Sequence, residues 1–185
     1  MPLSKQERDL LLRLAREALE AEVAGRRPPE PPQTGGELAE QRGVFVTLTH
    51  RGRLRGCIGT FQPTRPLVGQ VIEMAAEAAR DPRFVYERIT PDEVPDLTIG
   101  ISVLSPLEPV EDPLSIELGV HGIYVLGPGG RGGCFLPEVA DETGWTKEEF
   151  LSHCCGGKAG MAPDAWKSPD TRVLVFTTEK FDEGQ

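Results

Sequence analysis

The amino-acid sequence predicts an α+β protein in which a mainly antiparallel sheet is flanked by helices. Residues 44–49 and 54–61 are two β-like runs on either side of a tight turn, which is typical of a β-hairpin. Residues 97–103 alternate apolar and small or polar side chains, as a half-buried antiparallel strand does. Capped stretches with helical spacing accompany these strands, and no Rossmann fingerprint, helix-turn-helix or repeat period occurs.

The first predicted helix follows Ser4, which forms a capping box with Glu7. Leucine and alanine then recur at helical spacing as far as Leu19, so that one face is expected to pack on the core. The next segment, RRPPEPPQTGG at 26–36, is predicted to be an extended linker, because consecutive prolines forbid a helix. Its length lets the first helix pack away from the strand that follows.

A second helix is predicted to begin at Pro66 and to stop at the Asp-Pro pair of 81–82. Further along, capping-box residues Thr146 and Glu149 predict another helix start. The glycine-rich stretch GPGGRGG at 127–133 lacks the lysine of a phosphate-binding loop and is interpreted as a hairpin tip. The remaining predicted strands are 115–118, 122–126, 133–136 and a closing strand at 171–178.

Composition narrows the class of protein. A chain of 185 residues with 38% hydrophobic content buries enough core for one domain over 1–185, or for a domain with a small subdomain. The net charge of -9 and the pI of about 4.9 argue against nucleic acid as the main partner. No apolar run approaches the roughly 18 residues of a membrane span, and no apolar leader is visible, so we expect a cytoplasmic protein. The unpaired spacing of its cysteines favours reduced thiols.

The run LRGCIG at 54–59 is the most constrained segment of the chain. In a regular strand Arg55 and Cys57 share one face, whereas Leu54 and Ile58 point to the other. A cation beside a thiol favours the thiolate, and glycine inside a strand allows a ligand or another backbone to come close. The alternative is a structural thiol beside a bulge. The predicted ligand contacts are Arg55, Gly56, Cys57, Ile58 and Gly59.

Two further residues are candidates for proton transfer. His121, at a turn between predicted strands, could form with Cys57 the minimal pair for thiol activation and is also a predicted ligand contact. Its alternative role is a hydrogen-bonding cap of the turn. Glu73 lies one helical turn from Glu77, and such a pair suits acid-base work or an exposed surface on which Glu77 pairs with Arg80. A site role for Glu73 requires the helix to point it at Cys57.

A basic cluster surrounds the turn of the predicted hairpin. Its charges could attract a phosphate or a carboxylate, or could simply be solvated. No aromatic side chains alternate with these charges, which gives stacking on single-stranded nucleic acid little support. The cluster consists of His50, Arg51, Arg53 and Arg55.

A second group of potential ligands, His153, Cys154 and Cys155, does not predict a metal site. Structural zinc needs four ligands in recognisable pairs, and adjacent residues cannot all aim at one ion. We therefore expect no metal and no cofactor.

LRGCIG resembles the hallmark of the AMMECR domain family, named for the Alport syndrome, midface hypoplasia and elliptocytosis chromosomal region. The resemblance covers nearly the whole chain and implies a two-part α+β architecture with a smaller α/β subdomain. The biochemical function of the family is not established. Other stretches match in the same order, namely GVFVTL at 43–48, DPRF at 81–84, His121-Gly122, Phe135-Leu136-Pro137, Gly144-Trp145 and the stretch from Lys158-Ala159-Gly160 to Trp166.

Two functions stay open at this stage. In the first, the protein is a binding or accessory module whose cleft at 55–59 receives a peptide or a small anionic ligand. The resemblance implies partners of Memo-type or radical SAM class, which recur beside AMMECR domains. In the second, it is an enzyme acting on a nucleotide or modified RNA, with Cys57 as nucleophile, Arg55 as anion stabiliser, and His121 or Glu73 as proton carrier. The acidic charge favours the first, but substrate, oligomeric state and whether any reaction is catalysed are not decided by the residues.

Overall fold

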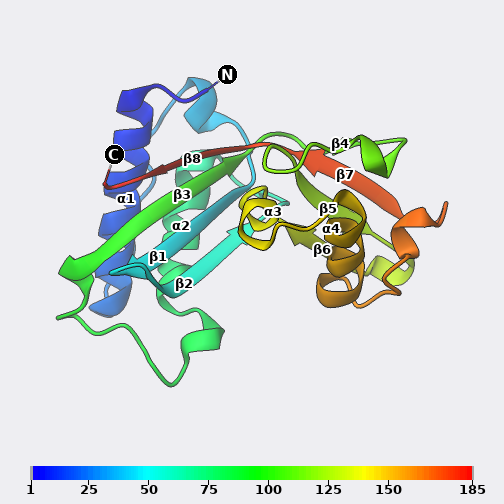
Figure 1. Cartoon of the computed structure of the whole chain (residues 1–185). Coiled ribbons are helices and arrows are strands. Elements are labelled where there is room, and N and C mark those ends of the chain that lie inside the picture. Colours follow the sequence, from blue (N-terminus) through cyan, green and yellow to red (C-terminus); the bar gives the residue numbers. More distant parts are fainter. Residues whose placement is uncertain (1, 185) are drawn as a thin grey trace. The chain divides into compact units, whose positions relative to one another are not determined.

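The computed structural model describes residues 2–184 and divides the chain into two compact units, each with a hydrophobic core of its own. Unit 1 is Met1–Leu104 with Glu179–Gln185, and unit 2 is Ser105–Thr178. Both units combine antiparallel strand pairs with helices, which confirms the predicted α+β class (Figure 1). Unit 2 is the shorter of the two.

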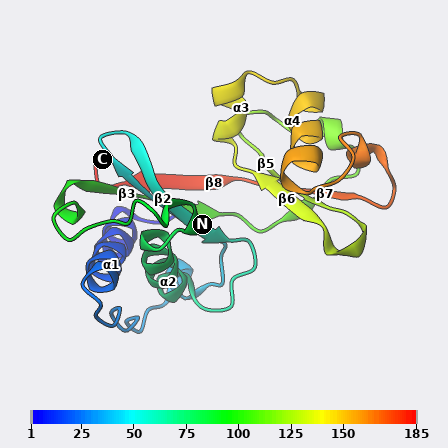
Figure 2. The same cartoon turned by 90° about the horizontal axis from the view of Figure 1, so that it is seen from below.

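Unit 1 is a four-stranded sheet with two helices on one face. The strand order is β2-β1-β3-β8, so β2 is an edge strand. Helices α1 and α2 lie side by side beneath the sheet (Figure 2). The bounds are α1 Lys5–Val23, β1 Val44–His50, β2 Arg53–Thr60, α2 Leu67–Ala79, β3 Leu97–Leu104 and β8 Thr178–Asp182.

The elements of unit 1 follow from local sequence signals. Both hydrogen bonds of the capping box between Ser4 and Glu7 are present at the start of α1. The hairpin turn uses positive φ at Arg51 (50°) and Gly52 (80°), the combination that suits a two-residue turn between twisted strands. Alternate residues of β1, beginning with Val44, are buried against the helices. The predicted hairpin, both helices and the strand at Leu97–Leu104 are confirmed.

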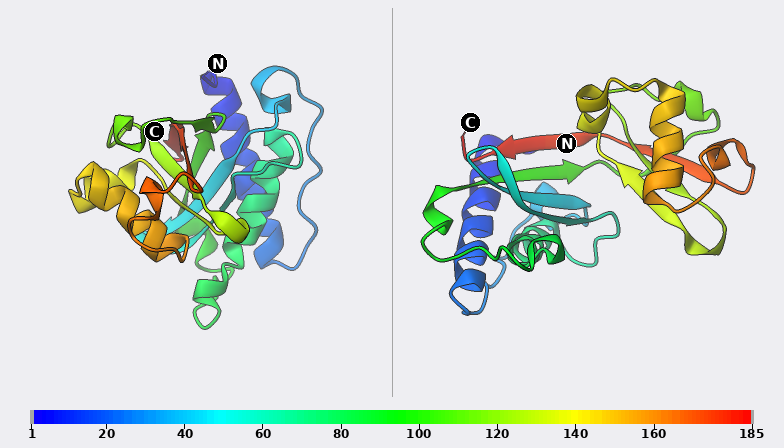
Figure 3. Two further views of the ribbon diagram at one scale, coloured as in Figure 1. Left: turned by 90° about the vertical axis from the view of Figure 1, so that its right-hand side faces the viewer. Right: turned by 60° about the horizontal axis from the view of Figure 1, so that its bottom comes forward.

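Unit 2 contains a second four-stranded sheet, with the strand order β4-β7-β5-β6. The ribbon of the helices of unit 2 lies over one face of this sheet (Figure 3). Helix α4 joins the core of the unit through Phe150 and Leu151, both fully buried, and begins at a complete capping box between Thr146 and Glu149. The bounds are β4 Glu108–Pro109, β5 Gly122–Leu126, β6 Gly132–Phe135, α3 Glu138–Thr143, α4 Lys147–His153 and β7 Arg172–Phe176.

The prediction of a strand at 115–118 is wrong. Asp112 accepts the Leu114 N–H at 2.9 Å, and Pro113 starts a 3₁₀ turn that ends at Ser115. The apolar signal of this stretch comes from Ile116, which is buried without belonging to a strand. Short 3₁₀ segments lie at Gly36–Ala39, Pro82–Phe84, Val94–Asp96, Pro113–Ser115, Pro128–Gly130 and Ala165–Lys167, and a π-helical turn lies at Cys154–Lys158.

Within residues 2–184, no helix combines the length and apolar character that a membrane crossing requires.

Candidate functional site

The signature run forms most of β2, and a β-bulge interrupts its pairing with β1. Cys57 lies opposite Thr47, but the register shifts so that Thr49 faces Leu54 and Arg55 is left without a partner residue. Because one extra residue has entered the strand, the alternation of side chains is displaced by one position before Gly56.

The bulge overturns the predicted pairing of Arg55 with Cys57 on one face. Cys57 projects on the side of Thr47, away from the helices, and Leu54 shares that side through its register with Thr49. Arg55 instead borders a hollow together with residues at the end of α2. The sequence assigned the two faces by strict alternation of side chains, and a bulge is the one strand feature that breaks this rule.

Arg55 is held in a buried ion pair. Only 7% of the residue is exposed, its Nε donates to Glu93, and its Nη2 donates to Glu93 Oε2 at 3.0 Å and to the Glu87 carbonyl at 2.8 Å. The hydrogen bond with Glu93 raises the pKa of Arg55 and lowers the pKa of Glu93. The guanidinium therefore donates to a backbone carbonyl and to a carboxylate that lie 32 and 38 residues further along the chain.

The basic cluster at the hairpin turn is largely neutralised by the same segment. Arg53 Nη2 lies 2.5 Å from Glu87 Oε2, and the ring nitrogens of His50 lie 3.7 Å from Glu93 and 3.9 Å from Asp96. Acidic residues of 87–96 thus already lie beside Arg53 and His50.

Asp81 and Arg83 clamp the backbone of Cys57. The Cys57 N–H donates to Asp81 Oδ2 at 2.9 Å, and Arg83 Nη2 donates to the Cys57 carbonyl at 3.0 Å. Arg83 also binds Asp81 through Nη2 at 2.6 Å. The motif DPRF therefore closes the exposed backbone edge of LRGCIG at this position, where an unpaired edge strand would otherwise offer hydrogen bonds to another chain. We call Asp81, Arg83 and the Cys57 backbone the clamp.

Burial and hydrogen bonding act in opposite directions on Asp81, which is 3% exposed. Burial raises the pKa of Asp81, but hydrogen bonds from Arg83 and from the Cys57 N–H together outweigh it and leave the pKa below its usual value. The hydrogen bond to Asp81 raises the pKa of Arg83, with a smaller contribution from the nearby Cys57. The carboxylate and guanidinium of the clamp are thus both held in their charged forms.

The Cys57 side chain is half-buried and accepts a hydrogen bond from the Thr47 hydroxyl at 3.2 Å. The cation that the sequence assigned to Arg55 is supplied instead by Arg83. DPRF contributed to the family resemblance, but without the fold nothing indicated that its arginine lies against Cys57. The ring centroid of Phe84, the last residue of DPRF, lies 6.0 Å from the guanidinium carbon of Arg55 and 5.7 Å from that of Arg83.

The glycines of the run are required by the protein's own packing. A Cβ on Gly56 would lie 2.1 Å from the Ala78 carbonyl oxygen, and a Cβ on Gly59 would lie 2.3 Å from the Phe45 ring. Phe45 in turn packs edge-on against Phe61, with ring centroids 5.1 Å apart. The close approach that the glycines predicted is therefore made by α2 and by an aromatic side chain.

The side of the sheet away from the helices carries small and aromatic residues around the thiol. We call this surface the Cys57 face. Register places Ser102 beside Phe45 and Gly100 beside Thr47, whereas Ile58 pairs with Val46 and packs against the core. The residues of the Cys57 face are Phe45, Thr47, Cys57, Gly59, Gly100 and Ser102.

The two proposed proton carriers belong to different units. Glu73 is on α2, beneath the opposite face of the sheet, where it pairs with Arg65 at 3.3 Å and accepts from Gln70 at 2.9 Å. His121 belongs to unit 2, and its Nδ1 accepts the Glu117 N–H at 3.0 Å, which is the capping role. Unit 1 therefore does not bring Glu73 to Cys57.

The remaining cysteines are packing residues. Cys154 and Cys155 are fully buried, and burial raises the pKa of both thiols and that of Cys134. His153 stacks on Trp145 at 4.1 Å between ring centroids. Among residues 2–184, no three histidine, cysteine or acidic side chains are grouped as a metal would require.

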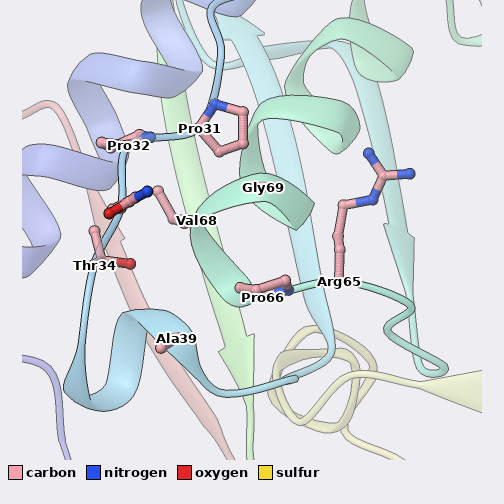
Figure 4. Close-up of a pocket in the computed structure, with 9 residues that line it drawn as sticks. Pro31, Pro32, Thr34, Ala39, Arg65, Pro66, Val68 and Gly69 are labelled. Atoms are coloured by element: carbon pink, nitrogen blue, oxygen red, sulfur yellow. The ribbon is translucent and has the colours of Figure 1, made fainter.

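Among the described residues of unit 1, two hollows lie on the helix side of the sheet and border its site residues or its linker. The larger, about 500 Å³, is walled by Pro31 and Pro32 of the linker and by Pro66 and Val68 at the start of α2 (Figure 4). The smaller, about 200 Å³, lies beside Arg55 and is lined by Phe84 and other residues of 79–89.

Comparison with known proteins gives one consistent family. The AMMECR1 family model matches residues 12–181. A protein of Thermococcus gammatolerans is 46% identical over 95% of this chain and 89% of its own length, and one of Methanopyrus kandleri is 46% identical over 98% and 90%. The crystal structure of an uncharacterized protein from Pyrococcus horikoshii, 42% identical, superposes with a TM-score of 0.84 and covers 94% of this chain and 89% of that one.

Proposed function

We propose that this chain, which belongs to the AMMECR1 family, is a binding or accessory module. It presents the Cys57 face to a protein partner, as the recurrence of AMMECR domains beside other proteins implies. One observation carries this proposal. The clamp holds the edge strand by its backbone, with both Cys57 backbone groups bonded, while the Cys57 side chain stays half exposed beside Thr47. A rigid strand whose side-chain face is not occupied by the helices of its own unit suits recognition.

The chemistry of the Cys57 face supports the same proposal. It combines small side chains with the Phe45–Phe61 pair, and aromatic residues are enriched in the cores of protein interfaces. The predicted cation, Arg55, is buried behind the strand and paired with Glu93, and Arg83, which lies near Cys57 instead, is paired with Asp81. Neither guanidinium is free to serve the thiol alone, which weakens the case for an activated thiolate. The proposed partners are of Memo-type or radical SAM class. We expect the complex to form in the cytoplasm, because all four cysteines are free thiols.

The test is direct binding between purified proteins. The chain is mixed with the Memo-type and the radical SAM proteins of its own genome, and calorimetry measures each dissociation constant. We expect one of them to bind, and Thr47→Arg, which places a long cation at the centre of the Cys57 face, to weaken binding at least about tenfold. Thr90→Arg, an exposed position outside this face, is the matched control. Absence of binding by both candidate partners, or equal binding by both variants, contradicts the proposal.

A cysteine-dependent enzyme acting on a nucleotide or RNA-linked substrate is the second candidate. It is favoured by the half-exposed Cys57 thiol, which has a hydroxyl donor at 3.2 Å and the Arg83 guanidinium nearby. Cys57→Ser separates the two functions, because it keeps the size and the hydrogen bond but removes the sulfur nucleophile. A binding module retains partner affinity and complements a deletion strain with this variant, whereas the enzyme loses activity.

A further inference from the structure

The hollow beside Arg55 is a second potential binding site, separate from the Cys57 face. It lies on the other side of β2 and has a volume of about 200 Å³. Its walls come from the end of α2 and the segment that follows. The apolar part of the lining is Ala79, Pro82, Phe84, Val85 and Ile89.

Arg55 brings an unused hydrogen-bond donor to this hollow. Its side chain is 8% exposed, and its Nε and Nη2 are bonded to Glu93 and to the Glu87 carbonyl. Its buried Nη1 has no hydrogen-bond acceptor among the described residues, and the Glu87 carboxylate oxygen nearest to it is 3.8 Å away. Buried donors almost always have an acceptor, and leaving one without an acceptor costs stability.

The charges around the hollow favour a negatively charged acceptor. Arg55, Arg80 and Arg88 line it, and of these Arg80 is paired with Glu22 and Glu77. Both acids of the lining already have cationic partners. Asp81 binds Arg83, and Glu87 binds Arg53 and lies 3.8 Å from Arg55 Nη1. A hydrogen bond from a guanidinium to a carboxylate is about twice as strong as one between neutral groups. The apolar residues of the lining favour a short hydrocarbon chain for the rest of the ligand. Polar groups in that part would lose their hydration without gaining hydrogen bonds.

We propose that this hollow binds a small carboxylic acid with a short, branched apolar chain. The carboxylate accepts from Nη1 of Arg55, and the chain packs against Phe84 and Ile89. The ligand completes the hydrogen bonding of a residue that the fold otherwise leaves with an unpaired donor. This proposal does not depend on partner binding at the Cys57 face.

The test uses isovalerate as the probe, with isovaleramide as its neutral counterpart of equal shape. Titration into the isotopically labelled full chain, followed by amide NMR, should give saturable shifts confined to residues around 55 and 79–89. We expect isovaleramide to bind at least about tenfold more weakly, because it lacks the charge. Saturation at other positions, equal affinity of acid and amide, or no saturable shift overturns the proposal.

Two variants make the result specific. Ala79→Leu fills the hollow without touching a charge and should abolish binding of isovalerate, whereas Ala24→Leu, at an exposed position beyond α1, should not change it. Arg55→Lys keeps the charge but removes the planar fork, and should weaken binding while leaving the apolar walls intact. If Arg55→Lys does not fold, the comparison of Ala79→Leu with Ala24→Leu decides. If Ala79→Leu still binds isovalerate, the proposed location of the ligand is wrong. This outcome is independent of the effect of Thr47→Arg on partner binding, so the two proposals fail separately.

Discussion

Asp81 is the residue at which two distant family motifs meet. Its carboxylate accepts from the Cys57 backbone and from Arg83, so one side chain both starts the turn at Pro82–Phe84 and closes the edge of β2. A buried carboxylate with this many donors stabilises the fold mainly in its ionised form. The clamp is thus a titratable structural element.

Asp81→Asn should therefore destabilise the protein in a pH-dependent way. The folded-state pKa of Asp81 lies below its ordinary value of 3.8, so its contribution is present above that pH and is lost as the pH falls through the folded-state pKa. At pH 7 we expect the variant to lose about 1–3 kcal/mol of unfolding free energy. The difference from the parent should shrink below about pH 4, as measured by urea denaturation across pH.

Asp9→Asn is the control for this experiment. Asp9 pairs with Lys5 on the exposed surface of α1, and such pairs contribute no more than about 0.5 kcal/mol. A loss of stability in Asp81→Asn that is equal at about pH 3 and pH 7 would mean that the carboxylate charge has no part in the clamp.

At the residue level the sequence singled out Cys57 but did not place the cations around it. The glycine-flanked cysteine stays a predicted site, and its residue is half-buried in the structure. The role of Arg83 depends on a contact made across 26 residues, which no local pattern encodes. The position of Arg55 depends on a bulge, which the glycines of 54–59 left open as an alternative without indicating at which residue it would fall.

At the scale of elements, α2 and β2 pack against each other without room for a side chain at Gly56. Gly56 faces the last turn of the helix, where an added methyl group would meet the Ala78 carbonyl oxygen at 2.1 Å. Backbone cannot yield as a flexible side chain does. The glycine therefore sets how closely the helix packs beneath the signature strand.

Gly56→Ala should lower the free energy of unfolding by about 1–3 kcal/mol, because the helix end must move to admit the new side chain. Thermal or urea unfolding measures the change. Gly35→Ala is the matched control, since a Cβ there meets nothing within 4 Å and the backbone is extended, at φ -123°. Equal stability of the two variants would contradict the tight contact between α2 and β2.

Elements were predictable where capping and periodicity agreed. The helices that begin after Ser4 and Thr146 have complete capping boxes, and the hairpin has a two-residue turn with strongly patterned strands. Elements without such signals were missed. Helix Glu138–Thr143 has no side-chain cap, and strand Thr178–Asp182 begins where the predicted closing strand 171–178 ends, with no turn signal to mark a new strand.

At the scale of the whole molecule, the end of the chain returns to the unit in which it began. Strand β8 is a neighbour of β3 in the sheet of unit 1. Glu179 accepts the Leu3 N–H at 3.1 Å and pairs with Arg8 at 2.9 Å, and Glu183 pairs with Arg16. Phe181 is 2% exposed in the core of unit 1, although it lies beyond all of unit 2 in the sequence. The fold of unit 1 thus requires both ends of the chain.

Phe181→Ala tests this division of the chain. Removal of a buried phenylalanine side chain costs about 3–5 kcal/mol, and Phe181 contributes to only one of the two cores. Hydrogen exchange followed by mass spectrometry should therefore show faster exchange in Lys5–Val23 and Leu97–Leu104, with Arg172–Phe176 unchanged. Phe150→Ala, at a fully buried position of unit 2, should give the reciprocal pattern. Faster exchange throughout the chain in both variants would show that the two cores open together, because separate cores predict that each substitution loosens only the unit that contains it.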